Sequence, residues 1–130
     1  MEKVIKSALI CIKDKKLLVV HKKTIDLYIL PRGKLEKGED DITSLHRECK
    51  EELGCDCTNL KYWETFPGAI HESKPLDIKC YFGDLKGEIK LNPEDNIDGF
   101  IWIDRNYKNI KMANSLQHKI IPELISGGLM

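Results

Sequence analysis

The stretch GKLEKGEDDITSLHRECKEELGC, from Gly33 to Cys55, decides the fold of this chain. Its glycine-containing first third predicts a loop. Asp40 or Asp41 can cap the helix that follows, because a short carboxylate accepts hydrogen bonds from the free N–H groups at a helix start. We expect the helix to end near Leu53, with Gly54 just past its last turn.

The expected helix has an apolar face and an acidic face. At about 100° per residue, four apolar side chains share an arc of roughly 80° and should pack on a sheet: Ile42, Leu45, Cys49 and Leu53. On the other face lie Glu48, Glu51 and Glu52, where each close like-charge pair costs roughly 0.2–0.5 kcal/mol, and only Arg47 offsets this locally. Such a cluster is either a solvated charged face or a site for Mg²⁺ or Mn²⁺, which bind carboxylate oxygens. Because Mg²⁺ also binds substrate phosphates, the second interpretation suggests phosphate chemistry.

The loop ahead of the helix favours the cation site. Its two glycines are spaced as in a P-loop, but Glu39 and Asp40 stand where a lysine and a hydroxyl residue belong, and no GxGxxG motif is present. The segment instead resembles the box of the Nudix hydrolase family, of the MutT-like type. The match consists of seven identities at fixed spacing: Gly33, Glu39, Arg47, Glu48, Glu51, Glu52 and Gly54. Both aliphatic positions of the box are cysteines, Cys49 and Cys55, which pack as small hydrophobes.

This resemblance implies a fold and a reaction class. Nudix proteins are α/β/α sandwiches with a mixed β-sheet between helices, and they are enzymes that hydrolyse a nucleoside diphosphate linked to another group. The resemblance implies that Glu48, Glu51 and Glu52 bind Mg²⁺ or Mn²⁺, and that Glu48 is the nearest candidate for the catalytic base. It also implies that Arg47 orients Glu51 or Glu52, and that Glu39 ties the loop to the helix.

Further oxygen ligands are implied outside the glutamate helix. The backbone carbonyl of Arg32, just before the first box glycine, is one candidate. A fourth carboxylate has five candidates: Asp84, Glu88, Glu94, Asp95 and Asp98. We favour the 94–98 loop, for which a solvated acidic turn is the alternative interpretation.

Three residues are candidates for substrate binding. Arg32 and Lys34 flank the first box glycine, where they can meet phosphate oxygens or remain surface cations. Arg32 makes the loop resemble that of diadenosine polyphosphate hydrolases. In contrast, Ala113-Asn114 resembles the segment in which MutT presents a base-reading asparagine, although Asn114 can equally cap the last helix. Residues 70–72 lack the proline of the ADP-ribose branch, which argues against that substrate.

The leading hypothesis is therefore a Mg²⁺-dependent pyrophosphohydrolase. It would convert a nucleoside triphosphate, including an oxidised one, to the monophosphate and pyrophosphate. A diadenosine polyphosphate hydrolase is the alternative within the enzyme class. A Nudix-fold module that senses a nucleotide without cleaving it is the alternative outside that class, and the three intact glutamates argue against it.

The rest of the chain predicts a single domain over residues 1–130. Strands are expected at 4–12, 17–21, 57–66, 76–85, 88–91 and 100–103, with a hairpin joining the first two. A second helix is expected at 113–125, where Pro122 should bend or interrupt it.

Composition limits the partners. The 130 residues contain 21 Lys+Arg and 21 Asp+Glu, and this balance argues against binding to a nucleic-acid polymer or an anionic membrane. We see no signal peptide and no apolar stretch near the ~20 residues of a membrane span, so a cytoplasmic protein is expected. Either a monomer or a homodimer is compatible with this sequence.

The cysteines and histidines suggest no further site. The five cysteines are odd in number and include no CxxC pair, so we expect reduced, buried thiols and neither a disulfide framework nor a tetrahedral zinc site. The four histidines have no metal-ligand spacing. His46 in particular is expected beside the packed helix face, with no functional role.

Overall fold

A computed structural model describes residues 3–68 and 74–130. The expectations for the first two residues and for residues 70–72 therefore lie outside the described part of the chain. The elements follow in chain order: β1 (Val4–Ile10), β2 (Ile12–Lys13), β3 (Lys16–Lys22), β4 (Leu27–Ile29), β5 (Arg32–Lys34), α1 (Asp41–Leu53), β6 (Asp56–Pro67), β7 (Leu76–Lys86), β8 (Ile97–Ile103), the π-helical turn η1 (Leu116–Ile120) and α2 (Ile121–Ser126).

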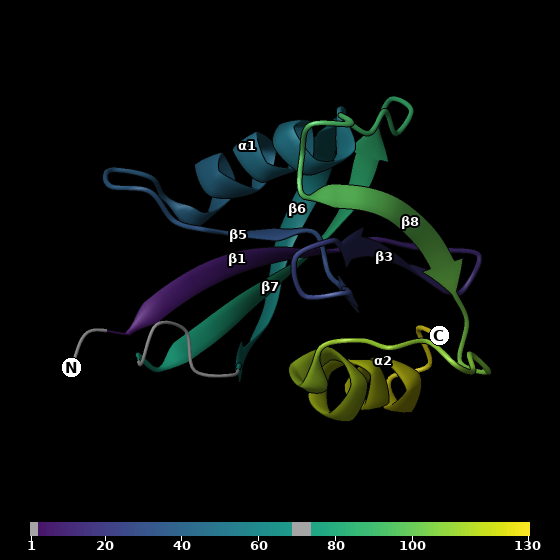
Figure 1. The fold of residues 1–130 in the computed structure, drawn as a ribbon. Helices are drawn as coiled ribbons and strands as arrows, with labels where there is room; N and C mark the ends of the chain where they lie inside the picture. Colours follow the sequence, from purple (N-terminus) through teal and green to yellow (C-terminus); the bar gives the residue numbers. More distant parts are fainter. Residues whose placement is uncertain (1–2, 69–73) are drawn as a thin grey trace.

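The strands form two sheets that lie between the two helices (Figure 1). The first sheet has the order β5-β1-β7-β6 and is mixed, because β1 and β7 run parallel while the other pairs are antiparallel. In the second sheet, β3 pairs antiparallel with β2, β4 and β8. The expected mixed α/β fold is confirmed, although two sheets stand where the expectation named one.

Each helix covers its own part of the core. Leu45, Cys49 and Leu53 of α1 are buried in one cluster, and residues of η1 and α2 are buried in the other. The middle of β3 supplies alternate side chains to the two clusters, so it is apolar on both faces. Ile42 was expected on the packed face, but it is 39% exposed, and Ser44 is the residue near the start of α1 that is buried.

The predicted hairpin is correct only at its tip. Asp14 and Lys15 have positive φ angles of 52° and 61°, as in a tight two-residue turn, and join β2 to β3. The prediction that the whole first strand pairs with β3 is wrong, since β1 pairs with β5 and β7 in the other sheet. The chain changes sheets at Cys11, whose carbonyl still accepts a hydrogen bond from Leu18 N.

Three other boundaries differ from the prediction. Gly33 and Lys34, expected in a loop, belong to β5 because this strand pairs with β1. No strand forms at 88–91, where Lys90 N instead donates to Leu53 O at the end of α1. The strand expected at 100–103 begins earlier, at Ile97, because it pairs with β3 along that length.

The last helical segment is interrupted as expected. Its turn at Leu116–Ile120 is π-helical, and Pro122 lies in the first turn of α2, where a residue without an N–H is tolerated.

Candidate active site

Helix α1 is fixed at both ends by the residues the sequence singles out. Asp40 caps its start, accepting a hydrogen bond from Thr43 N at 2.8 Å. Gly54 ends it with a φ of 68°, a conformation that favours glycine, and a Cβ there would lie 2.0 Å from Lys90 O. The buried hydroxyls of Ser7 and Ser44 join β1 to α1 at 3.0 Å. These contacts fix the rotation of α1, and with it the direction of its glutamates.

Glu48 and Glu52 lie against β5. A Cβ on Gly33 would be 1.9 Å from the Glu48 carboxyl carbon, so only glycine leaves room for that side chain. Arg32 N donates to Glu52 Oε1 at 2.9 Å. Strand β5 therefore packs against α1 within the box, with Gly33 in contact with Glu48.

Arg47 connects the loop to the helix. Its guanidinium donates to both carboxylate oxygens of Glu39, at 2.7 and 2.9 Å, and this pairing lowers the pKa of Glu39 to about 2. It also donates to Glu48 at 2.6 Å, to Glu51 at 3.2 Å and to the Lys34 carbonyl at 3.1 Å. Arg47 thus holds Glu48 and Glu51, whereas Glu52 bonds to the backbone of β5.

The carboxylates of Glu48 and Glu52 are crowded and poorly solvated. Burial, and then the charge of Glu48, raises the pKa of Glu52 to about 8. Burial also raises the pKa of Glu48, against the lowering effect of Arg47. Glu51 differs from both, since its side chain is 56% exposed. A positive charge close to both carboxylates would favour their ionised forms.

Within the 94–98 loop, Asp95 is the residue whose charge acts on Glu52. Its charge contributes to the raised pKa of Glu52. Its Oδ2 atom is buried without a hydrogen-bond partner in the described residues, although Oδ1 accepts from Asn96 N at 2.7 Å. In contrast, Asp98 binds the His21 ring at 2.6 Å.

The other candidates for a fourth carboxylate lie elsewhere or are exposed. Asp84 accepts a hydrogen bond from Asn59, and Asp84 and Glu88 line a hollow of about 570 Å³ whose lining contains no residue of the box. Glu94 is exposed.

Basic side chains lie within electrostatic reach of the carboxylates, and sequence reasoning identified Arg32 and Arg47 among them but missed Lys6. Lys6 on β1 is 9% exposed, and its pKa is lowered to about 8 by burial and then by the charges of Arg32 and Lys22, against the opposite effect of Glu52 and Glu48. Arg32 Nε is buried and has no hydrogen-bond partner among the described residues. A lysine within an apolar buried strand was the available signal for Lys6.

Lys34 and Asn114 are not part of this charge cluster. The Lys34 side chain is exposed and lines a separate hollow with Lys3 and Lys74. Asn114 is exposed in the first helical turn after Ala113, whose N–H bonds to Tyr28 O on β4 at 3.0 Å. Asn114 therefore lies inside that turn, one residue past the capping position.

The donor set fits a hard divalent cation. Two glutamates with raised pKa values lie beside β5, and a buried oxygen of Asp95 has no hydrogen-bond partner in the described part of the chain. All of these ligand atoms are carboxylate oxygens, as Mg²⁺ and Mn²⁺ prefer. A divalent ion at this place would favour the ionised forms of both glutamates.

The family follows from comparison with known proteins. The NUDIX domain model matches residues 3–124, so the chain belongs to the Nudix hydrolase family. It is accordingly an enzyme that hydrolyses pyrophosphate bonds, and members of this family typically use divalent metals and nucleotide-like substrates. No curated protein sequence matches the chain.

Solved structures agree with the fold. A MutT NUDIX hydrolase from Burkholderia pseudomallei is 16% identical, with a TM-score of 0.79 over 88% of this chain and 93% of that one. The Bacillus subtilis pyrophosphohydrolase BsRppH is 24% identical, with a TM-score of 0.73 over 93% and 78%. A C. elegans Ap4A hydrolase is 20% identical, with a TM-score of 0.65 over 78% and 80%. At these identities the likeness concerns the fold alone. Within residues 3–68 and 74–130, no helix has the length and hydropathy to cross a membrane.

Proposed function

We propose that this protein is a Mg²⁺- or Mn²⁺-dependent pyrophosphohydrolase that converts a nucleoside triphosphate to its monophosphate and pyrophosphate. The observation that carries the proposal is the pairing of Glu48 and Glu52 beside β5, with Asp95 and the buried Lys6 in electrostatic reach. Carboxylates for a cation and a buried ammonium for phosphate oxygens are the two requirements of a pyrophosphate site.

Within this proposal, Glu48, Glu51 and Glu52 hold the metal, and Asp95 is the fourth carboxylate. The bound ion would neutralise charge on the pyrophosphate and lower the pKa of a water molecule. Glu48 accepts the proton from the attacking water. Arg47 acts as a positioning residue, since its guanidinium fixes the carboxylates of Glu48 and Glu51.

The substrate is anchored by cations on β1 and β5. Lys6 and Arg32 are both largely desolvated, and Arg32 Nε has no hydrogen-bond partner among residues 3–68 and 74–130, so a phosphate oxygen would satisfy it. Such an anchor suits a triphosphate and a dinucleoside polyphosphate equally. Asn114 favours the triphosphate, because its exposed amide offers a donor and an acceptor to a purine edge. The five free cysteines support a reducing compartment, the cytoplasm.

A substrate panel tests the proposal. The protein is incubated with Mg²⁺ and ordinary and oxidised nucleoside triphosphates, diadenosine tetraphosphate and nucleotide sugars, and the products are separated by anion exchange. We expect pyrophosphate from a triphosphate. ATP from diadenosine tetraphosphate as the preferred reaction would replace the substrate assignment, and binding without turnover would favour a sensor.

Two matched variants locate the site. Glu52→Gln should remove most activity with the near-ultraviolet circular dichroism unchanged. Glu88→Gln removes an exposed carboxylate that lines the other hollow, and should leave activity intact. Equal activity of the two variants would contradict the site.

A further inference from the structure

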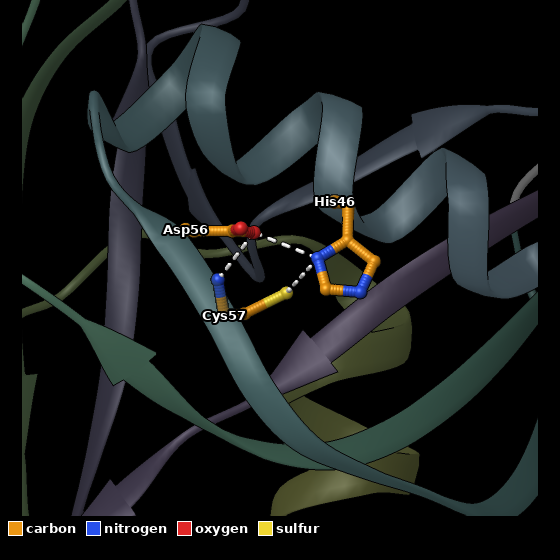
Figure 2. A group of neighbouring side chains, drawn as sticks. All are labelled: His46, Asp56 and Cys57. Atoms are coloured by element: carbon orange, nitrogen blue, oxygen red, sulfur yellow. Dashed lines mark hydrogen bonds and ion pairs between the residues drawn. The ribbon is translucent and has the colours of Figure 1, made fainter.

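A second group of metal-ligating side chains lies where α1 meets the first residues of β6. It consists of His46 from α1 and the adjacent Asp56 and Cys57 from β6 (Figure 2). One ligand atom from each residue lies within 4.8 Å of the other two. Figure 2 shows the imidazole, the carboxylate and the thiol pointing toward one another.

The distances are close to those of a tetrahedral site. His46 Nδ1 is 3.8 Å from Cys57 Sγ, and zinc with ordinary Zn–N and Zn–S bonds separates these ligands by about 3.6 Å. His46 Nδ1 is 2.7 Å from Asp56 Oδ1, where a shared zinc requires about 3.3 Å. A shift of about 0.6 Å between the imidazole and the carboxylate would therefore replace the hydrogen bond with two metal bonds.

The chemistry selects a different ion from the one at the glutamates. An imidazole, a thiolate and a carboxylate are ligands of Zn²⁺, whereas Mg²⁺ prefers oxygen alone. The pKa of Cys57 is lowered because the Cys49 thiol donates a hydrogen bond to its sulfur, which favours the thiolate. A thiolate and a carboxylate together balance the charge of one Zn²⁺.

Accessibility and position also suit a separate site. The side chains of His46 and Asp56 are 40% and 33% exposed, which leaves an entry path, while Cys57 is buried beneath them. Along the helix, His46 stands about 200° from Glu48, so the two groups occupy different faces of α1.

We propose that His46, Asp56 and Cys57 bind one Zn²⁺, with water as the fourth ligand, independently of the carboxylate site. It departs from the expectation that His46 has no functional role and that the cysteines form no tetrahedral zinc site, an expectation that stays untested. The signal was hidden because His46 lies ten residues before Asp56, and only the turn at Gly54 brings them together. The proposal does not rest on the substrate assigned above.

Cobalt substitution tests the proposal. Reduced, metal-free protein is titrated with Co²⁺ in excess Mg²⁺, which occupies the carboxylate site. We expect one equivalent to bind, with a sulfur-to-cobalt charge-transfer band and the visible spectrum of a tetrahedral ion. Adding Zn²⁺ should remove both signals. The same spectrum is expected in Glu52→Gln, because that residue belongs to the other site.

Variants assign the ligands. Cys57→Ser should lose the charge-transfer band. His46→Gln should weaken Co²⁺ binding by more than about 100-fold, because loss of a residue that only supports a metal ligand costs about 10–100-fold. Cys80→Ser is the matched control, since Cys80 is also a buried free thiol but belongs to the other core cluster. If Cys57→Ser does not fold, the loss of Co²⁺ affinity in His46→Gln tests the proposal. This variant should fold, because the His46 side chain is half-exposed. A wild-type protein without the band, or a band that survives both substitutions, would overturn the proposal.

Discussion

Replacing Glu52 with glutamine should stabilise the metal-free protein while removing its activity. The pKa of Glu52 is raised from 4.5 to about 8, so its ionisation opposes folding. The sign follows from proton binding, because between these two values the folded protein binds more protons than the unfolded chain. The contribution of Glu52 to the stability of the wild type therefore falls as pH rises from about 4.5 to about 8, and stays constant at higher pH.

The size of the effect follows from the same two values. At pH 7 the unfolded chain has ionised Glu52, whose ordinary pKa lies about 2.5 units lower, while the folded protein still holds it protonated. Each pH unit corresponds to about 1.36 kcal/mol, so Glu52 lowers the free energy of unfolding of the wild type by about 3 kcal/mol. Glu52→Gln keeps an oxygen for the hydrogen bond from Arg32 N but cannot ionise. We expect the variant to unfold about 10 °C above the wild type in EDTA.

Urea unfolding with EDTA, from about pH 5 to about pH 8, is the assay. The stability gap between variant and wild type should widen as pH rises, and Mg²⁺ should narrow it by stabilising the wild type through binding. Glu51→Gln is the control, because this side chain is 56% exposed and its loss should change stability by less than about 0.5 kcal/mol. A Glu52→Gln variant no more stable than wild type at pH 7, or a gap independent of pH, would refute the reasoning.

Three further predictions follow from the same contacts. Gly33→Ala should lower kcat by about 100-fold in a folded protein, because the new Cβ displaces the Glu48 carboxylate; an unchanged kcat would contradict the close approach. Lys6→Met should lower kcat/KM about 10- to 100-fold at constant Mg²⁺ affinity, as measured by steady-state kinetics and calorimetry. His21→Gln should destabilise the protein in urea at about pH 5.5 more than at about pH 9, since Asp98 raises the pKa of His21 and that stabilisation is lost as pH rises through the raised value. Equal losses at both pH values would contradict this last prediction.

Local patterns made the glutamate helix predictable. The residues that cap the helix lie next to its ends in the sequence. Asp40 precedes its first turn, and Gly54 follows Leu53, its last residue, so capping chemistry alone locates the helix. The glutamates share one face because of helical geometry, and the Nudix resemblance adds their relation to the loop. The expected mixed fold followed from the same resemblance.

Contacts between distant segments were not predictable in this way. Nothing near Lys6 in sequence shows that β1 runs beside the carboxylates, and only the sheet places it there. The segment at 88–91 has the composition of a strand, but the bond from Lys90 N to Leu53 O takes it to the end of α1.

The most direct test of the central claim is phosphorus NMR of a nucleoside triphosphate incubated with the protein and Mg²⁺. We predict signals of the monophosphate and pyrophosphate, present with the wild type and almost absent with Glu48→Gln or Glu52→Gln. Release of orthophosphate and a nucleoside diphosphate, or undiminished turnover in both variants, would contradict the account.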